Sequence, residues 1–241
     1  MTINIVVPIS GGKDSQACVK SAVLQYGSDK VIGLFNDTGW EHPLTYEHID
    51  KISNLYGIEI IRTIGSVENE IKKLSRFPNP ICRFCTDRLK IKKTKDFLDS
   101  LSKKIGGFEV WYGMRADESN DRKKRYKDVF CDEVYAPHDI NSSYPKYLEK
   151  RGVYFRLPII NWTKEEVFSF LNNEHNPLYN YGFTRVGCFP CLASGKKNHS
   201  NAFNFDSFGQ TQKQRVIELE NIIGKKHVPA NTDQMCMFCH I

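Results

Sequence analysis

The sequence predicts an α/β protein in which a mostly parallel sheet carries helices on both faces. Short runs of β-branched residues alternate with helical patterns along the first half of the chain, which is typical of strands joined by crossover helices. Strands are expected at Asn4 to Ile9, Val31 to Asn36, Glu59 to Thr63, Glu109 to Gly113 and Val153 to Ile159. Helices are expected at Asp14 to Gln25, Pro43 to Tyr56, Val67 to Leu74, Thr86 to Lys103, Thr163 to Asn172 and Gln212 to Ile223.

The composition excludes several classes of protein. The 241 residues include 34 Lys and Arg against 28 Asp and Glu, giving a net charge of +6, and 40% of them are hydrophobic. This balance is typical of a soluble globular chain rather than a disordered or collagenous one. No stretch reaches the roughly 18 apolar residues of a membrane helix, and the N-terminus lacks the basic start of a signal peptide. We therefore expect a cytoplasmic protein with no membrane partner.

The pattern of elements divides the chain in two. Residues 1–175 are expected to form a nucleotide-binding α/β domain, and the cysteine-rich residues 176–241 an irregular extension packed on it. Within the first part, the polar stretch 114–150 has no clear periodicity and is expected to be a mobile loop region.

A glycine-rich loop lies between the first strand and the first helix. It reads Ser10, Gly11, Gly12, Lys13, Asp14 and Ser15. The glycines permit a tight turn, the amides at the start of the helix can bind anionic oxygens, and a lysine and two serines add further donors. The loop therefore predicts a phosphate site, although it lacks the spacing of the Walker motif.

This loop resembles the PP-loop of N-type ATP pyrophosphatases. Four further segments narrow the resemblance to the phosphoadenosine phosphosulfate (PAPS) reductase-like family, which includes the ATP pyrophosphatases of DNA phosphorothioation. The segments are Asp37-Thr38-Gly39 with Glu41 and Pro43; Cys85-Thr86 with Leu89-Lys90; Gly113-x-Arg115-x-x-Glu118-Ser119-x-x-Arg122; and Pro158 through Trp162-Thr163 and Asn176-Pro177-Leu178-Tyr179 to Gly187-Cys188-x-x-Cys191. The resemblance implies the adenine-nucleotide alpha-hydrolase-like (HUP) fold, with ATP or PAPS and Mg2+ as ligands.

The loop and the resemblance together give a set of site residues. Lys13, Asp14 and Arg115 are the expected catalytic residues of the nucleotide site. The expected cofactor-binding residues are Ser10, Gly11, Gly12, Lys13, Asp14, Ser15, Asp37, Gly113, Arg115 and Arg122. Asp37 follows a strand, where it can contact ribose, adenine or magnesium, or simply form a turn before Gly39. Arg115 and Arg122 can clamp pyrophosphate or a phosphosulfate.

Two basic runs leave nucleic-acid binding open. The first comprises Arg88, Lys90, Lys92, Lys93 and Lys95, and the second Arg122, Lys123, Lys124, Arg125 and Lys127. Such runs suit a polyanion such as DNA or RNA, but a solvated helix face explains them equally well.

Six of the eight cysteines occur in three Cys-x-x-Cys pairs. Two such pairs are the usual framework for zinc or an iron-sulfur cluster. Similarity to the cluster-bearing reductases of the family implies a 4Fe-4S cluster on Cys82, Cys85, Cys188 and Cys191. The alternative is zinc on Cys188, Cys191, Cys236 and Cys239. The remaining Cys18 and Cys131 are expected to be small hydrophobes.

The C-terminal pair bears on the mechanism. Reductases of this family end in a mobile tail with one reactive cysteine, whereas this chain ends Met235-Cys236-Met237-Phe238-Cys239-His240-Ile241. His240 can favour the thiolate of Cys239. A doubled cysteine suits persulfide carriage, disulfide exchange or metal binding, so Cys236 and Cys239 are the expected catalytic cysteines.

Three functions follow from these residues. The first is an ATP pyrophosphatase that adenylylates a target and supports sulfur transfer, with a sulfur donor such as a cysteine desulfurase and nucleic acid as one acceptor. The second is a PAPS or adenylyl-sulfate reductase that makes sulfite with thioredoxin. The third is a zinc-bound nucleotide-binding subunit without turnover. A homodimer is compatible with all three.

Overall fold

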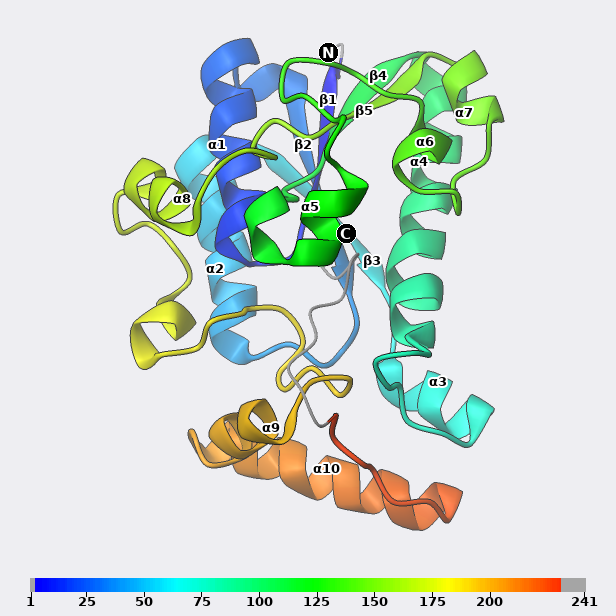
Figure 1. The fold of residues 1–241 in the computed structure, drawn as a ribbon, viewed down its shortest axis with the longest axis vertical. Coiled ribbons are helices and arrows are strands. Elements are labelled where there is room, and N and C mark those ends of the chain that lie inside the picture. The colour runs from blue at the N-terminus through cyan, green and yellow to red at the C-terminus, as the bar shows by residue number, and fades with distance from the viewer. Residues whose placement is uncertain (1–2, 231–241) are drawn as a thin grey trace.

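The computed structural model describes residues 3–230 and is built on a five-stranded parallel sheet (Figure 1). The strand order is β3-β2-β1-β4-β5, and each neighbouring pair runs parallel. The strands are β1 (Ile5–Ile9), β2 (Val31–Asp37), β3 (Glu59–Ile64), β4 (Phe108–Trp111) and β5 (Val153–Arg156). The expected fold class and all five strands are confirmed.

Alternate residues of β1 pack into two hydrophobic cores, one on each face of the sheet. Ile5, Val7 and Ile9 pack on one face, and Val6 packs on the other, because successive side chains of a strand point to opposite sides. Helices cover both faces, as expected. The first face carries α1 (Lys13–Tyr26), α2 (Pro43–Tyr56) and α8 (Lys164–Leu171), and the second carries α4 (Lys92–Ile105), α6 (Pro137–Ile140) and α7 (Tyr147–Lys150).

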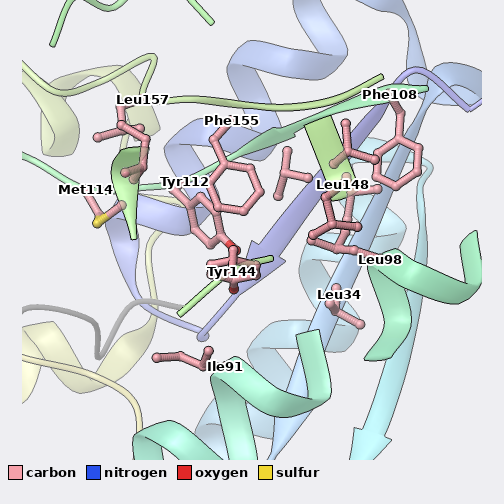
Figure 2. Packing of buried hydrophobic residues seen from close by; sticks show 14 of the residues in the cluster. Leu34, Ile91, Leu98, Phe108, Tyr112, Met114, Tyr144, Leu148, Phe155 and Leu157 are labelled. Carbon is pink, nitrogen blue, oxygen red and sulfur yellow. The ribbon is translucent and has the colours of Figure 1, made fainter. Parts of the chain in front are cut away.

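Aromatic rings dominate the core on the α4 side. Figure 2 shows Phe155 beside Tyr112 and Tyr144, and the centroid of its ring lies 4.8 Å from that of each tyrosine. The two tyrosine hydroxyls lie 2.8 Å apart and so satisfy each other. Hydrogen bonding of this kind removes most of the cost of burying a hydroxyl.

Two regions of residues 1–175 differ from the expectation, and beyond them α9 (Lys196–Phe203) forms where irregular structure was expected. The stretch 114–150 is not simply a loop, because it forms a 3₁₀ turn at Ala116–Glu118, α5 (Asn120–Arg125), α6 and α7, and buries Tyr144 and Leu148. Helices of four to six residues are too short to show a helical period, which explains the error. The expected helix from Thr86 exists, but Thr86–Ile91 is a π-helix that leads into α4.

The C-terminal helices lie near the carboxyl ends of the strands (Figure 1). They are α9 (Lys196–Phe203) and α10 (Ser207–Ile223), and α3 (Val67–Leu74) packs beside α10. Arg215 of α10 forms an ion pair with Glu68 at 2.6 Å, donates to the Gly39 carbonyl at 3.0 Å and stacks over the ring of Trp40. Among the described residues, no helix is long and apolar enough to cross a membrane.

A buried histidine between α1 and α2 makes stability depend on pH. Burial lowers the pKa of His48 to about 4 from an ordinary value of 6.5, and its Nε2 lies 2.8 Å from Gln16 Oε1. Below pH 6.5 the unfolded chain binds a proton that the folded chain does not, so the free energy of unfolding falls as the pH falls. Between about pH 7 and pH 4 the loss from this group is about 3 kcal/mol.

We predict that His48→Gln removes this part of the pH dependence. Urea unfolding of the wild type and the variant between pH 7 and pH 4 measures it, and the difference between the two curves isolates His48 from other titrating groups. Parallel curves would contradict the prediction.

Candidate nucleotide site beside a cysteine loop

The glycine-rich loop turns sharply between β1 and α1. Gly11 has φ +77°, and a Cβ on it would lie 2.5 Å from Thr45 Cγ2 of α2. Both the backbone conformation and the close approach therefore require glycine. The loop adopts the strand-to-helix position expected of a phosphate site.

Side chains close the loop from three directions. Ser15 Oγ donates to the Gly12 carbonyl at 2.9 Å and accepts from the Ser10 amide at 3.2 Å. Asn176 Nδ2 donates to the Gly11 carbonyl at 3.1 Å. The Tyr179 hydroxyl accepts from the Lys13 amide at 3.1 Å. The segment around Asn176 thus holds the loop in place. The sequence had indicated this segment as part of the family pattern, but not its role in holding the loop.

A buried carboxylate joins the two expected catalytic cations. Asp14 accepts from Lys13 Nζ at 2.7 Å and from Arg115 Nε at 2.6 Å, and all three residues are buried. Burial lowers the pKa of Lys13, an effect that the negative charge of Asp14 opposes. Arg115 also donates to the Trp162 carbonyl at 3.3 Å. The structure therefore brings Lys13, Asp14 and Arg115 together.

A polar pocket opens beside this ion pair. It is lined by Lys13, Asp14, Arg115, Asp117, Glu118, Lys164, Tyr179, Thr184 and Arg185. We call it the phosphate pocket, because cations from several elements face it next to the loop. Lys164 and Arg185 were not identified from the sequence, since neither belongs to a recognisable motif.

Two expected ligand residues have other contacts. Among the described residues that line the phosphate pocket, Arg122 is not included. It is buried and forms an ion pair with Glu118, which does line the pocket. Asp37 lies at the carboxyl end of β2, where its Oδ1 accepts from the Gly39 amide and the Tyr46 hydroxyl, both at 2.8 Å. This is the turn geometry that the sequence left as an alternative for Asp37.

Most residues of the two basic runs are exposed or half-buried, as a solvated helix face predicts, and one residue of each run is buried. Lys90 and Arg122 are buried, whereas Arg88 pairs with Glu70 at 2.9 Å and Lys92 with Asp96 at 2.6 Å. Within the second run, Lys123 and Lys124 are exposed.

The segment that carries Cys188 and Cys191 packs against the edge of the nucleotide site. The Phe189 amide donates to the Trp40 carbonyl at 2.7 Å, and Trp40 Nε1 donates to the Pro190 carbonyl at 3.1 Å. A Cβ placed on Gly12 would lie 3.3 Å from the Val186 carbonyl. We call residues 183–191 the cysteine loop; it contacts both the phosphate loop and the loop after β2.

Cys188 has an acidic and largely buried environment. It forms a β-bridge with Glu41, and its Sγ lies 3.7 Å from Glu41 Oε1 and 3.5 Å from Thr38 Oγ1. Burial raises the pKa of Cys188 to about 12 and also raises the pKa of Glu41. The negative charge of Cys85 adds to the rise at Cys188, whereas Lys90 opposes it. Without a metal, Cys188 is therefore a neutral thiol.

The expected metal quartet is only partly assembled. Cys82, Cys85 and Cys188 pack around one apolar cluster, yet across residues 3–230 no three His, Cys, Asp or Glu side chains gather closely enough to hold a metal ion. In the described arrangement these residues do not complete a four-thiolate site, so no chemical step is derived through one. Of the two unpaired cysteines, Cys18 is buried as expected and Cys131 is exposed. Cys236 and Cys239 lie outside the described residues.

The model of the phosphoadenosine phosphosulfate reductase domain matches residues 4–194. The chain belongs to the phosphoadenosine phosphosulfate reductase domain family. This confirms the resemblance inferred from the loop and its four companion segments.

The relatives within this reductase-domain family are covered by this chain to different extents. An uncharacterized protein of Methanocaldococcus jannaschii is 31% identical over 78% of this chain and 36% of its own length. An uncharacterized protein of Escherichia phage 186 is 27% identical over 92% of this chain and 75% of its own. The adenosine 5'-phosphosulfate reductase of Salinibacter ruber is 29% identical over 66% of this chain and 56% of its own. The chain thus spans about a third to three quarters of these relatives.

The fold of this reductase-domain chain also resembles a solved structure. The NMN synthetase from Francisella tularensis superposes with a TM-score of 0.50 and 14% identity, covering 97% of this chain and 90% of that one. At this identity the likeness concerns the fold alone.

We predict that Gly113→Ala damages nucleotide binding. A Cβ on Gly113 would lie 2.6 Å from the Asp14 carbonyl carbon and 2.7 Å from the Ser15 amide nitrogen, so the start of α1 must move. Overpacking of this kind costs about 2 kcal/mol of unfolding free energy. The affinity for α,β-methylene-ATP, measured by calorimetry, should fall roughly tenfold or more.

Gly106→Ala is the matched control. Gly106 has φ +85°, and a Cβ there would meet nothing within 4 Å. Its unfolding free energy should fall by roughly 1 to 3 kcal/mol, because φ +85° with ψ −143° is a backbone conformation essentially restricted to glycine, and the affinity should be unchanged. Equal affinities of the Gly113 variant and the wild type would refute the close contact.

Proposed function

We propose that this protein is an ATP pyrophosphatase that activates an acceptor for sulfur transfer. The observation that carries the proposal is the contact between the phosphate loop and the cysteine loop, where the Val186 carbonyl lies against Gly12 and Cys188 bridges to Glu41. A site for phosphate groups and a pair of thiols therefore adjoin at the carboxyl edge of one sheet, where ligands of open α/β sheets bind.

The proposed first step is adenylylation. An oxygen of the acceptor attacks the α-phosphorus of ATP, a new phosphorus–oxygen bond forms, the α–β bridge breaks and pyrophosphate leaves. Lys13 and Arg115, held in place by Asp14, stabilise the negative charge that develops on the departing pyrophosphate. Mg2+ accompanies ATP in this proposal, and the carboxylates of Asp117 and Glu118 in the phosphate pocket are oxygen donors of the kind that it prefers.

The proposed second step uses a persulfide. Its terminal sulfur displaces AMP from the acceptor, and a second thiol then cleaves the resulting disulfide, which leaves a thiolated acceptor and a cysteine disulfide. A dithiol reductant of the thioredoxin class restores the pair, and a cysteine desulfurase supplies the sulfur. The described chain ends at Ala230, whose amide donates to the Ser194 carbonyl at 3.0 Å, close to the cysteine loop.

Cys236 and Cys239 are the proposed carriers of that persulfide. They follow Ala230 by six and nine residues in the sequence. Six residues of extended chain span about 20 Å at most, which bounds the reach of Cys236 from Ala230. Nucleic acid is one acceptor compatible with the exposed Lys123 and Lys124.

We predict pyrophosphate release from ATP and Mg2+ by the wild type, and its loss in Lys13→Gln. Removing the cation leaves the pyrophosphate charge less stabilised, so the rate should fall by roughly 100-fold or more. An enzyme-coupled pyrophosphate assay, run with and without tRNA or DNA, makes the measurement. Lys51→Gln, at an exposed position on α2, is the control and should keep the wild-type rate.

A reductase is the second candidate. It is favoured by the family match and by the relative named adenosine 5'-phosphosulfate reductase. Sulfite formation from PAPS or adenylyl sulfate with thioredoxin, in a protein that releases no pyrophosphate from ATP, would establish this activity and overturn the first.

We also propose that Cys82, Cys85, Cys188 and Cys191 hold a metal centre, either a 4Fe-4S cluster or zinc. The support is the spacing of the two pairs and the packing of Cys82, Cys85 and Cys188 around one apolar cluster. Binding would require the two loops to close toward each other.

We predict that anaerobically purified protein contains stoichiometric iron with a brown colour, or else zinc without colour. Cys191→Ser should lose most of that metal, measured by elemental analysis. Cys131→Ser, which alters an exposed cysteine outside the three pairs, should retain it. Equal metal contents in both variants, or none in the wild type, would exclude the site.

A further inference from the structure

We infer that Arg185 binds the phosphate groups of the nucleotide from the side of the cysteine loop and so couples nucleotide binding to the position of that loop. The inference rests on the proposed function only in requiring that a nucleotide binds at the phosphate loop. No motif in the sequence indicates this residue.

Arg185 belongs to the walls of two neighbouring pockets. It lines the phosphate pocket together with Lys13, Arg115 and Lys164. With Thr184 it also lines a second pocket, which extends along the cysteine loop to Cys188 and Cys191 and is closed by Lys90, Ser194, Asn198 and Ala202. Thr184 and Arg185 therefore form the wall that the two pockets share.

The backbone around Arg185 is fixed against the phosphate loop. The Val186 carbonyl approaches Gly12, and Tyr179 accepts a hydrogen bond from the Lys13 amide. The charge of Arg185 acts on Tyr179, where it opposes the effect of Asp14 on the pKa of the hydroxyl. Arg185 lines the phosphate pocket together with Lys13 and Asp14, so its side chain faces the start of α1.

The charge balance of the phosphate pocket calls for a further cation. Lys13 and Arg115 both pair with Asp14, and Arg115 pairs with Asp117 as well at 3.3 Å. A nucleotide triphosphate carries more negative charge than Lys13 and Arg115 balance, and two further cations, Lys164 and Arg185, line the same pocket. Arg185 supplies charge from another wall, and a guanidinium can bind phosphate oxygens in the bidentate manner that a lysine ammonium cannot.

Because Arg185 lines both pockets, its contact with phosphate also affects the cysteine loop. When Arg185 engages phosphate, the segment that leads to Gly187 and Cys188 is held as well, because only two residues separate Arg185 from Cys188. The cysteine loop is then held more firmly when the nucleotide is in place. Sulfur chemistry would thereby depend on prior binding of the nucleotide.

The test compares Arg185→Gln, Arg185→Lys and the wild type in the full chain. We expect Arg185→Gln to weaken binding of α,β-methylene-ATP roughly tenfold by calorimetry, while adenosine, which has no phosphate, binds all three proteins equally. Arg185→Lys should recover part of the lost affinity. A merely structural role would weaken both ligands alike and would overturn the inference.

Hydrogen–deuterium exchange measures the coupling. Saturating α,β-methylene-ATP should slow exchange of residues 183–191 in the wild type and leave it unchanged in Arg185→Gln. Arg62→Gln, on the edge strand β3 and paired with Asp50, is the control and should behave as the wild type in both assays. Wild-type affinity and wild-type protection in Arg185→Gln would overturn this inference alone. Absence of nucleotide binding by the wild type would overturn the proposed function with it.

Discussion

The buried carboxylate of Asp14 is the group on which the arrangement of the site depends. It holds Lys13 and Arg115, which are 102 residues apart in the sequence, and Arg115 in turn reaches the Trp162 carbonyl before α8. The Asp14 carboxylate thus links the phosphate loop to the segment after β4, and through Arg115 it also links both to the residues that precede α8. An unpaired carboxylate at this depth would be costly, so the two cations and the carboxylate stabilise one another. The glycine at position 113 allows that meeting, because any larger side chain would strike the backbone of α1.

A second set of contacts draws the C-terminal part of the chain to the same edge of the sheet. Trp40, in the loop after β2, accepts from the Phe189 amide and donates from its indole to the Pro190 carbonyl of the cysteine loop. Arg215 of α10 stacks on the Trp40 ring. These contacts are mostly buried and involve an aromatic ring, so they tolerate little displacement. The thiols and the phosphate loop are held near each other by packing rather than by a covalent link.

Periodicity and turn chemistry were enough to predict the parallel sheet, the long helices and the phosphate loop. Val67–Leu74 and Pro43–Tyr56 were predicted to the residue, because apolar positions recur at helical spacing. The structure adds that the side chains of Ser66 and His42 cap their N-termini. Short helices such as Pro137–Ile140 could not be predicted, since four residues show no period. Arg122 was expected to contact a ligand, but it forms an ion pair with Glu118. No sequence pattern indicated that both of these side chains are buried. Tyr179, Lys164 and Arg185 reach the site from positions more than 150 residues after the loop, and only tertiary structure brings them there.

The order of the strands also explains why the site is accessible. From β1 the chain moves outward through β2 to β3 with its helices on one face, and then crosses to β4 and β5 by way of α4 on the other face. The connections therefore diverge at β1, and the two layers of helices part above its carboxyl end, at a topological switch point. A nucleotide that enters this crevice displaces solvent rather than packed side chains. A ligand can therefore enter and leave this crevice without opening either hydrophobic core, even though the side chains around Asp14 are rigidly held.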